Sequence, residues 1–299
     1  MAILLARDTT AIIQGMTGHE GMRILRAMRD YYTYVVAGVT PGKGGTEVEG
    51  APVFNSVAEA VAKFRNITAS VVSVPPARAK DAIMEAIQSN IKLIHVLVEH
   101  MPIRDAAYVL SATRERGLRI LGPASIGAIA PGIGRIGIIG GFEPDDIYRP
   151  GTIGIISRSG GMANELAWAV RCAGLGQSTV VGIGGEVLIG TTFADLLQDF
   201  ENDPQTEAIV IFGELGGQQE YEIIELRERG IITKPIAMHI AGSFASVLPL
   251  GTSFGHAGAI VEQGRGSVAA KEAALLGAGI AVAQTVYDLP DMIRSVVTV

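Results

Sequence analysis

The chain has 299 residues, of which 48% are apolar and 18% are charged, and it contains 38 glycines with a formal net charge of -6. This composition excludes a disordered chain and is typical of buried parallel strands joined by glycine-bearing turns, while the length favours two domains of about 150 residues each. The acidic balance, with scattered lysines and arginines, lacks the basic surface that nucleic-acid binding requires, so we expect no nucleic acid partner.

The single cysteine, Cys172, rules out a disulfide framework or a cysteine zinc site within the chain, and no metal site is expected. The apolar start of the chain ends at Arg7, which makes it too short for a signal peptide or a membrane span. We therefore expect a soluble, cytoplasmic protein without membrane association.

The first 123 residues alternate short β-branched runs with helical patterns. A repeated strand–helix–strand order returns each strand in the same direction, so it predicts a parallel sheet. The expected strands are residues 11–14, 35–39, 69–74, 93–98 and 119–122, and the clearest helices are residues 56–64 and 77–88.

A glycine-rich turn follows the first expected strand and contains Gly15, Thr17 and Gly18 before the next helix begins. Such a turn at a helix N-terminus is where a Rossmann-type fold binds phosphate. NAD-binding domains hold the ribose with an acidic residue after the second strand, but this chain has Lys43 in that region and no carboxylate. A cation there favours coenzyme A or NADP over NAD; the alternative is a solvated lysine in a turn.

The alternation of strands and helices is interrupted between residues 124 and 150. This segment contains Pro131 and Pro144 and follows Pro123. We interpret this segment as the crossing between two domains. The strand–helix alternation then restarts and continues through residues 151–299, which predicts a second open α/β sheet.

Two turns of this second half carry groups suited to an anion site. Ser157, Ser159, Gly160 and Gly161 join a buried strand to a helix and offer hydroxyls, N–H groups and the positive end of a helix dipole. Glu214 follows another buried strand, at the edge where open α/β sheets bind ligands. The two turns together predict a phosphate or carboxylate site.

His256 lies between two glycines in a loop of small residues. Flanking glycines let the backbone approach a ligand closely and leave the imidazole accessible. A neutral imidazole can attack phosphorus with one ring nitrogen while a carboxylate, here Glu214, holds the other. The alternative is a loop histidine without a role. Because no Walker loop or kinase signature accompanies it, we expect the phosphoryl donor to bind elsewhere.

Taken in order, these motifs resemble those of the α subunit of succinyl-CoA synthetase and its relatives, the nucleotide-dependent acyl-CoA ligases. The likeness runs along the whole chain through GMTGHEG, VTPGKGG, SRSG, VGIGGE, DPQTEAIV, GELGG and FGHAGAI. It implies a Rossmann-type CoA-binding domain, followed by a flavodoxin-like ligase domain in which His256 is phosphorylated and Glu214 is its carboxylate partner.

The resemblance also implies a hetero-oligomer, in which an ATP-grasp β subunit binds ATP and Mg²⁺. The positions that match the family's CoA contacts are Thr17, Gly18, His19, Glu20, Lys43, Leu97, Val98 and Glu99.

Three departures from the succinate pattern resemble the citrate-type members, ATP-citrate lyase and the small subunit of citryl-CoA synthetase. They are Ala124–Gly127 after Gly122-Pro123, Tyr148–Gly151, and Gly161–Glu165, where Asn164 stands in place of the usual tyrosine. Asn164 and the added glycine would give room and hydrogen bonds to a hydroxylated tricarboxylate, so citrate is the expected acid. A succinyl-CoA synthetase or another dicarboxylate–CoA ligase remains the alternative.

The chain ends at Val299, soon after the last expected ligase-domain helix, which favours a synthetase that releases citryl-CoA over a lyase. Two further classes stay open. A non-catalytic CoA-binding regulatory protein would not need the histidine loop and GELGG, and an NADP-dependent dehydrogenase would need an acid or base near an acceptor carbonyl, for which the second half offers no obvious residue.

Overall fold

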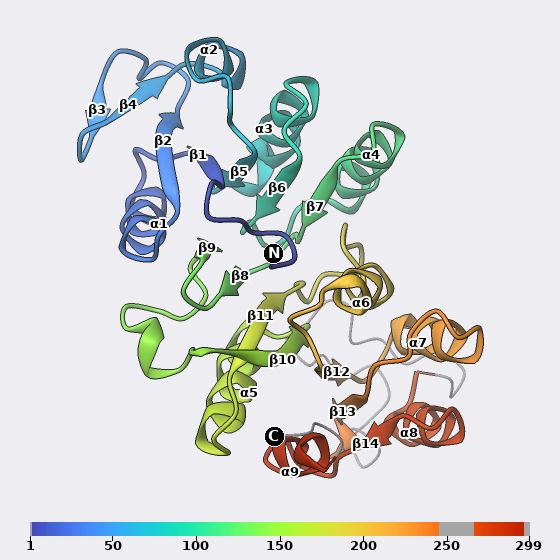
Figure 1. Ribbon diagram of the computed structural model, residues 1–299. Coiled ribbons are helices and arrows are strands. Elements are labelled where there is room, and N and C mark those ends of the chain that lie inside the picture. Colours follow the sequence, from blue (N-terminus) through green and yellow to red (C-terminus); the bar gives the residue numbers. More distant parts are fainter. Residues whose placement is uncertain (1, 245–265, 296–299) are drawn as a thin grey trace.

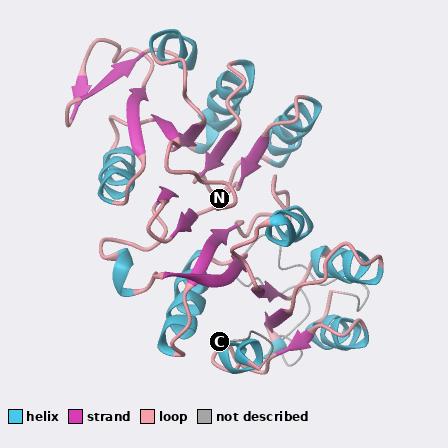
Figure 2. Cartoon of the chain, viewed as in Figure 1, coloured by secondary structure: helices cyan, strands magenta, loops and turns pink. Residues whose placement is uncertain are grey.

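The structure is a computed structural model that describes residues 2–244 and 266–295. In this part of the chain two α/β units pack against each other, each built on a seven-stranded sheet with helices on both faces (Figure 1; Figure 2). This arrangement confirms the predicted fold class, a Rossmann-type domain followed by a second α/β domain.

The first unit is a parallel sheet with one antiparallel edge strand. Its strands are β1 (Thr10–Gln14), β2 (Tyr34–Val39), β3 (Glu47–Val48), β4 (Ala51–Phe54), β5 (Ala69–Val72), β6 (Leu93–Val96) and β7 (Arg119–Leu121), and its helices are α1 (His19–Asp30), α2 (Val57–Lys63), α3 (Pro76–Gln88) and α4 (Ile103–Glu115). The sheet order is β3-β4-β2-β1-β5-β6-β7, with only β3 antiparallel to its neighbour. Numbered along the chain, the parallel strands follow the Rossmann order 3-2-1-4-5-6.

Helices cover both faces of this sheet, which explains why its strands read as continuous apolar runs. Successive side chains of a strand point to opposite faces. Ile12 of β1 accordingly packs in the cluster formed with α2, α3 and α4, whereas Ala11 and Ile13 pack in the cluster that contains α1.

The second unit has the flavodoxin order. Its strands are β8 (Gly127–Ala130), β9 (Gly134–Gly137), β10 (Pro150–Ser157), β11 (Gln177–Gly182), β12 (Ala208–Glu214), β13 (Ile236–Ala241) and β14 (Ala281–Val282); its helices are α5 (Gly160–Cys172), α6 (Phe193–Asn202), α7 (Gln219–Glu228), α8 (Val268–Gly277) and α9 (Leu289–Arg294), with a 3-10 turn η1 (Pro144–Asp146). The sheet order is β14-β13-β12-β10-β11-β8-β9. Its parallel strands follow the order 2-1-3-4-5.

The segment expected to be only a crossing contains an antiparallel hairpin, β8–β9, which extends the second sheet next to β11. A Cβ at Gly127, where φ is +109°, would lie 1.8 Å from the backbone oxygen of Ile136, so only glycine allows this approach. The sequence did not predict the hairpin, because strands of only four residues show too few alternations to be recognised.

The two sheets share one hydrophobic core. It joins apolar side chains of β1 and α1 to those of the β8–β9 hairpin, β10 and α6. Arg135 of β9 is buried in the same region, and its guanidinium donates to the backbone oxygens of Ala27, Ile139 and Gly141. The contact between the units is therefore apolar at its centre and also holds a buried, hydrogen-bonded cation.

None of the helices that the structure describes is both long and apolar enough to cross a membrane.

Candidate functional site

Each sheet changes strand order at one point, and candidate site residues gather at both. In open α/β sheets ligands bind beyond the carboxyl ends of the strands at this switch point. In the first sheet the switch lies between β1 and β5, and in the second between β10 and β12.

The turn after β1 depends on two glycines. Gly15 has φ of +87°, and a Cβ there would lie 2.1 Å from the backbone oxygen of Ser73, in the turn after β5. A Cβ at Gly21 in α1 would lie 2.3 Å from the backbone oxygen of Gly15. The glycines therefore let α1 start directly beneath the turn, and its first N–H groups have no side-chain cap.

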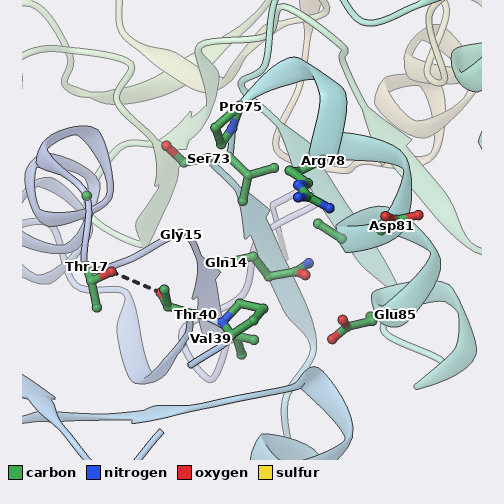
Figure 3. Close-up of a pocket in the computed structure, with 14 residues that line it drawn as sticks. Gln14, Gly15, Thr17, Val39, Thr40, Ser73, Pro75, Arg78, Asp81 and Glu85 are labelled. Carbon is green, nitrogen blue, oxygen red and sulfur yellow. Dashed lines mark hydrogen bonds between the residues drawn. The ribbon is translucent and has the colours of Figure 1, made fainter. Parts of the chain in front are cut away.

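A cavity of about 640 Å³ opens between the turns after β1, β2 and β5. Figure 3 shows Thr17 and Thr40 on one side of it and Arg78, Asp81 and Glu85, which come from α3, on the other. The two threonine hydroxyls lie 3.3 Å apart. A cavity of this size, with a few polar groups and a helix N-terminus at its wall, is suited to a small-molecule ligand that carries phosphate.

The structure brings only two of the predicted CoA contacts into the wall of this cavity, Thr17 and Gly18. His19 and Glu20 begin α1 beside it, and their side chains lie 3.4 Å apart near the surface. Lys43 is exposed in the turn after β2 and does not line the cavity. The roles of these residues in CoA binding stay predictions.

Leu97, Val98 and Glu99 follow β6 and do not line the cavity either. Sequence reasoning missed Ser73 and Arg78, which do line it. The sequence did contain a sign of these two residues. The expected strand that ends at Val74 is followed by two prolines, which are typical of a helix start, and in a Rossmann sheet this strand pairs with β1.

The second switch point carries the predicted anion turn. Ser159 is the N-cap of α5, and its hydroxyl accepts a hydrogen bond from the N–H of Met162 at 3.5 Å. The Ser157 hydroxyl donates to the backbone oxygen of Ser159 and accepts from its N–H, so it shapes the turn. A Cβ at Gly160 would touch Ile126, at 2.4 Å, whereas one at Gly161 would meet no atom within 4 Å. The described structure leaves space next to Gly161 at the start of α5.

The Asn164 side chain is engaged within the protein. Its Oδ1 accepts hydrogen bonds from the Tyr148 hydroxyl at 2.6 Å and the Gly140 N–H at 3.1 Å, and its Nδ2 donates to the Gly160 backbone oxygen at 3.5 Å. Burial raises the pKa of the Tyr148 phenol, which keeps this hydroxyl a donor. Two of the predicted citrate-type departures, Tyr148 and Asn164, therefore contact each other.

Glu214 lies at the end of β12 and is buried, and its Oε1 lies 3.0 Å from Nε of Arg158. Arg158 follows β10 and is itself 3% exposed, and its Nη2 donates to the backbone oxygen of Glu186. The switch point of the second sheet thus holds a buried ion pair next to the start of α5. His256 lies outside the described residues, so its pairing with Glu214 stays a prediction.

Sequence reasoning also missed Lys271 and Glu220, which form a buried ion pair of 2.6 Å against the same turn. Burial lowers the pKa of Lys271. Both residues stand in sequence stretches that look like ordinary helices, where a charged side chain is expected to be exposed to solvent.

Within residues 2–244 and 266–295, no cluster of three or more histidine, cysteine, aspartate or glutamate side chains could hold a metal ion.

Comparisons with known proteins agree with this two-part arrangement. A family model described as "CoA binding domain" matches residues 6–100, and one described as "CoA-ligase" matches residues 156–281. Among solved structures, ATP citrate lyase from Methanosaeta concilii in complex with (3S)-citryl-CoA has a TM-score of 0.90 and 28% identity, covering 98% of this chain. The match covers 50% of the lyase chain, so this chain spans about half its length.

Curated relatives match over nearly the full length of both chains. The alpha 2 subunit of the ADP-forming succinate–CoA ligase of Archaeoglobus fulgidus is 42% identical over 297 residues, which are 99% of this chain and 100% of that protein. The SauD subunit of the ADP-forming sulfoacetate–CoA ligase of Bilophila wadsworthia is 37% identical over 295 residues, 99% of each. The chain thus belongs to the succinate–CoA ligase alpha-subunit family, in which a CoA-binding domain precedes a CoA-ligase domain.

Proposed function

We propose that the chain is the α subunit of an ATP-dependent citrate–CoA ligase, which works through phosphorylated His256. The observation that carries this proposal is the buried pair of Glu214 and Arg158 at the second switch point, beside the start of α5. Family membership supports it, because the named relatives are subunits of ADP-forming acid–CoA ligases.

The proposed reaction has three balanced steps. A ring nitrogen of His256 attacks the γ-phosphorus of ATP, and ADP leaves. A carboxylate oxygen of the acid then attacks the phosphorus, which gives an acyl phosphate and frees the imidazole. The CoA thiol loses its proton and attacks the acyl carbon, and inorganic phosphate leaves as the thioester forms.

The residues of this chain would support these steps by orientation and charge. The N–H groups at the start of α5, around Ser159, Gly160 and Gly161, would stabilise the transferred phosphoryl group. The carboxylate of Glu214 would hold the second ring nitrogen of His256 and set its orientation. CoA would bind in the cavity of the first unit, in contact with Thr17 and Gly18.

ATP and Mg²⁺ would bind to an ATP-grasp β subunit, so the active protein would be a hetero-oligomer. The sequence supports this division, because it contains no Walker loop or kinase signature.

The choice of citrate depends on the segments 122–127 and 161–165 and is supported by the structural similarity to ATP citrate lyase. One such solved structure, from Methanothrix soehngenii, is in complex with citrate and coenzyme A and has a TM-score of 0.90. The contacts of Asn164 with Tyr148 and Gly140 leave its side chain less free for the acid than the sequence suggested. Its effect on the acid would therefore be exerted through the shape of the segment before β10.

Succinate is the second candidate, and it is favoured by the 42% identity to succinate–CoA ligase α subunits. The two acids are separated by measuring thioester formation by the complex of this chain with its ATP-grasp partner, with each acid in turn and products identified by mass. We expect citrate to have a specificity constant on the order of a hundredfold higher, because a site built for a larger polyanion leaves polar groups unpaired when a smaller acid binds. A higher specificity constant for succinate would assign the chain to the second candidate.

The histidine step is tested with the same complex, γ-labelled ATP and Mg²⁺. We expect acid-labile, base-stable phosphate on this chain, and His256→Ala should abolish the label and turnover. Glu214→Gln should slow labelling on the order of a hundredfold without unfolding the chain. Label retained in His256→Ala would refute the mechanism, and a chain that binds CoA but acquires no label would be a CoA-binding regulatory protein.

A further inference from the structure

Lys271 of α8 is fully buried, with 0% of its side chain exposed, and its ammonium group faces the turn that follows β12. Nζ donates to the backbone oxygens of Glu214, at 2.8 Å, and of Gly216, and to Oε2 of Glu220 at 2.6 Å. These are three acceptors, the number that an ammonium group can serve. Two of its three donors therefore bind this turn, and the third binds the Glu220 carboxylate of α7.

Glu220 of α7 pairs with Lys271, and its side chain is 1% exposed. Its second oxygen, Oε1, lies against Gly213, and a Cβ at that glycine would be only 2.9 Å from it. The glycine before Glu214 thus allows the carboxylate of Glu220 to approach the end of β12.

The buried pair of Lys271 and Glu220 contributes little net stability to the fold. Burial of two charges is offset only by excellent geometry, and an apolar pair of similar volume is often as stable or more stable. Apolar side chains, however, cannot donate hydrogen bonds to backbone oxygens. What Lys271 adds beyond packing is the fixed position of the oxygens of Glu214 and Gly216.

Those oxygens belong to the turn that sets the Glu214 side chain against Arg158. Gly216 and Gly217 both have positive φ, at +81° and +62°, so this turn relies on backbone conformations with little side-chain support. The backbone N–H of Leu215 donates to the backbone oxygen of Ala241, and the N–H of Gly216 donates to that of Gly266, both at distances under 3.0 Å. Lys271 binds the backbone oxygens of Glu214 and Gly216 in this turn.

We propose that Lys271 is a positioning residue for phosphoryl transfer, which acts by holding the backbone of the 214–216 turn so that the Glu214 carboxylate keeps its place. The inference rests on the proposed function, since it assigns Lys271 a role through Glu214. It does not require Lys271 to touch a substrate.

The experiment replaces the pair with apolar residues, Lys271→Met/Glu220→Met, in the complex with the ATP-grasp partner. Three quantities are measured: the single-turnover rate of labelling from γ-labelled ATP, the affinity for CoA and the melting temperature. We expect labelling to slow by about 10- to 100-fold, the effect of misplacing a catalytic group by about 1 Å, with CoA affinity unchanged within about twofold.

The matched control is Lys234→Met. Lys234 precedes β13 and also donates to two backbone oxygens, those of Phe200 and Asp203, which lie at the C-terminal end of α6 and not at the 214–216 turn. It should lower the melting temperature without slowing the labelling step. If Lys234→Met slowed labelling as much as the apolar pair does, the loss of any lysine that binds backbone oxygens would slow labelling. That result would overturn the proposal.

A double-mutant cycle with Glu214→Gln separates positioning from a general structural role. If Lys271 acts through Glu214, the apolar pair should slow labelling by less than about twofold once Glu214 is already Gln. Equal losses in both backgrounds would overturn the proposal and leave the proposed function intact. Labelling that Glu214→Gln does not slow at all would remove the role of Glu214 and, with it, the proposal.

Glu220→Gln supplies a second variant if the apolar pair does not fold. It keeps Lys271 and its bonds to the two backbone oxygens, so labelling should slow by less than about threefold. A loss as large as that expected for the apolar pair would mean that the charge of Glu220, and not the lysine's hold on the turn, is what matters.

Discussion

His95 gives a prediction about stability whose magnitude follows from its surroundings. The side chain is fully buried on β6, where Nε2 lies 2.8 Å from the backbone oxygen of Ser125, and among the described residues Nδ1 has no hydrogen-bond partner. Burial lowers the pKa of His95 from 6.5 to about 4. The ring is therefore neutral in the folded protein at neutral pH and donates through Nε2.

The sign of the effect follows from proton binding. Below pH 6.5 the unfolded chain takes up a proton at His95, and the folded chain does so only near pH 4, so stability falls as the pH is lowered between these values. At about 1.4 kcal/mol for each tenfold change, the loss is roughly 2 kcal/mol at pH 5 and about 3 kcal/mol once the folded state is also protonated.

The substitution His95→Gln keeps an N–H donor and removes the titration. Urea unfolding of both proteins between pH 7.5 and pH 5 should show the wild type losing about 2 kcal/mol more than the variant, while other titrating groups contribute equally to both. His19→Gln, at an exposed histidine of α1, is the control for removing one histidine. Parallel pH profiles for wild type and His95→Gln would refute the reasoning.

Three further predictions concern the CoA cavity and the contact between the units. Gly15→Val should abolish CoA binding measured by calorimetry, because the added side chain would collide with the backbone of Ser73 at 2.1 Å; wild-type affinity would contradict this. Arg78→Ala should weaken CoA binding more than Lys43→Ala, for which we expect about tenfold, since only Arg78 lines the cavity, and the reverse order would exclude Arg78 as a contact. Arg135→Met should lower the free energy of unfolding by about 3 kcal/mol, because the buried guanidinium donates to three backbone carbonyls, of which that of Ile139 is buried. Arg119→Met, which removes an ion pair that is one-third exposed, should cost at most about 1 kcal/mol, and equal losses would argue against a special role of Arg135.

The alternation of strands and helices could be predicted because it depends on local patterns. The expected strands at residues 11–14, 35–39 and 93–98 correspond to β1, β2 and β6, with differences only at their ends. The β8–β9 hairpin was not predicted, since its strands are only four residues long and its pairing with β11 depends on contacts between distant parts of the chain.

The sequence predicted some features of the candidate sites and not others. The glycine-rich turn after β1 could be located from the sequence, because glycine is needed there for a backbone reason. That it binds phosphate stays a prediction. The buried ion pairs of Arg158 and Lys271 were not predicted, because a buried charge has no local signature and is recognised only when its partners are in place. The predicted CoA contact at Lys43 depends on side-chain reach, which residue order does not give.

The shared core between the two sheets limits how the enzyme could move. Separating the units would expose the apolar side chains that join α1 and β1 to the hairpin and α6, and would leave the Arg135 guanidinium without its partner at Ala27. A hinge motion between the two units is thus opposed by the same contacts that fold this chain. The distance between the cavity after β1 and the Glu214 turn is therefore fixed once the chain has folded. If CoA binds in this cavity as proposed, we expect its long arm or a loop, and not a hinge between the two units, to bring the reacting groups together.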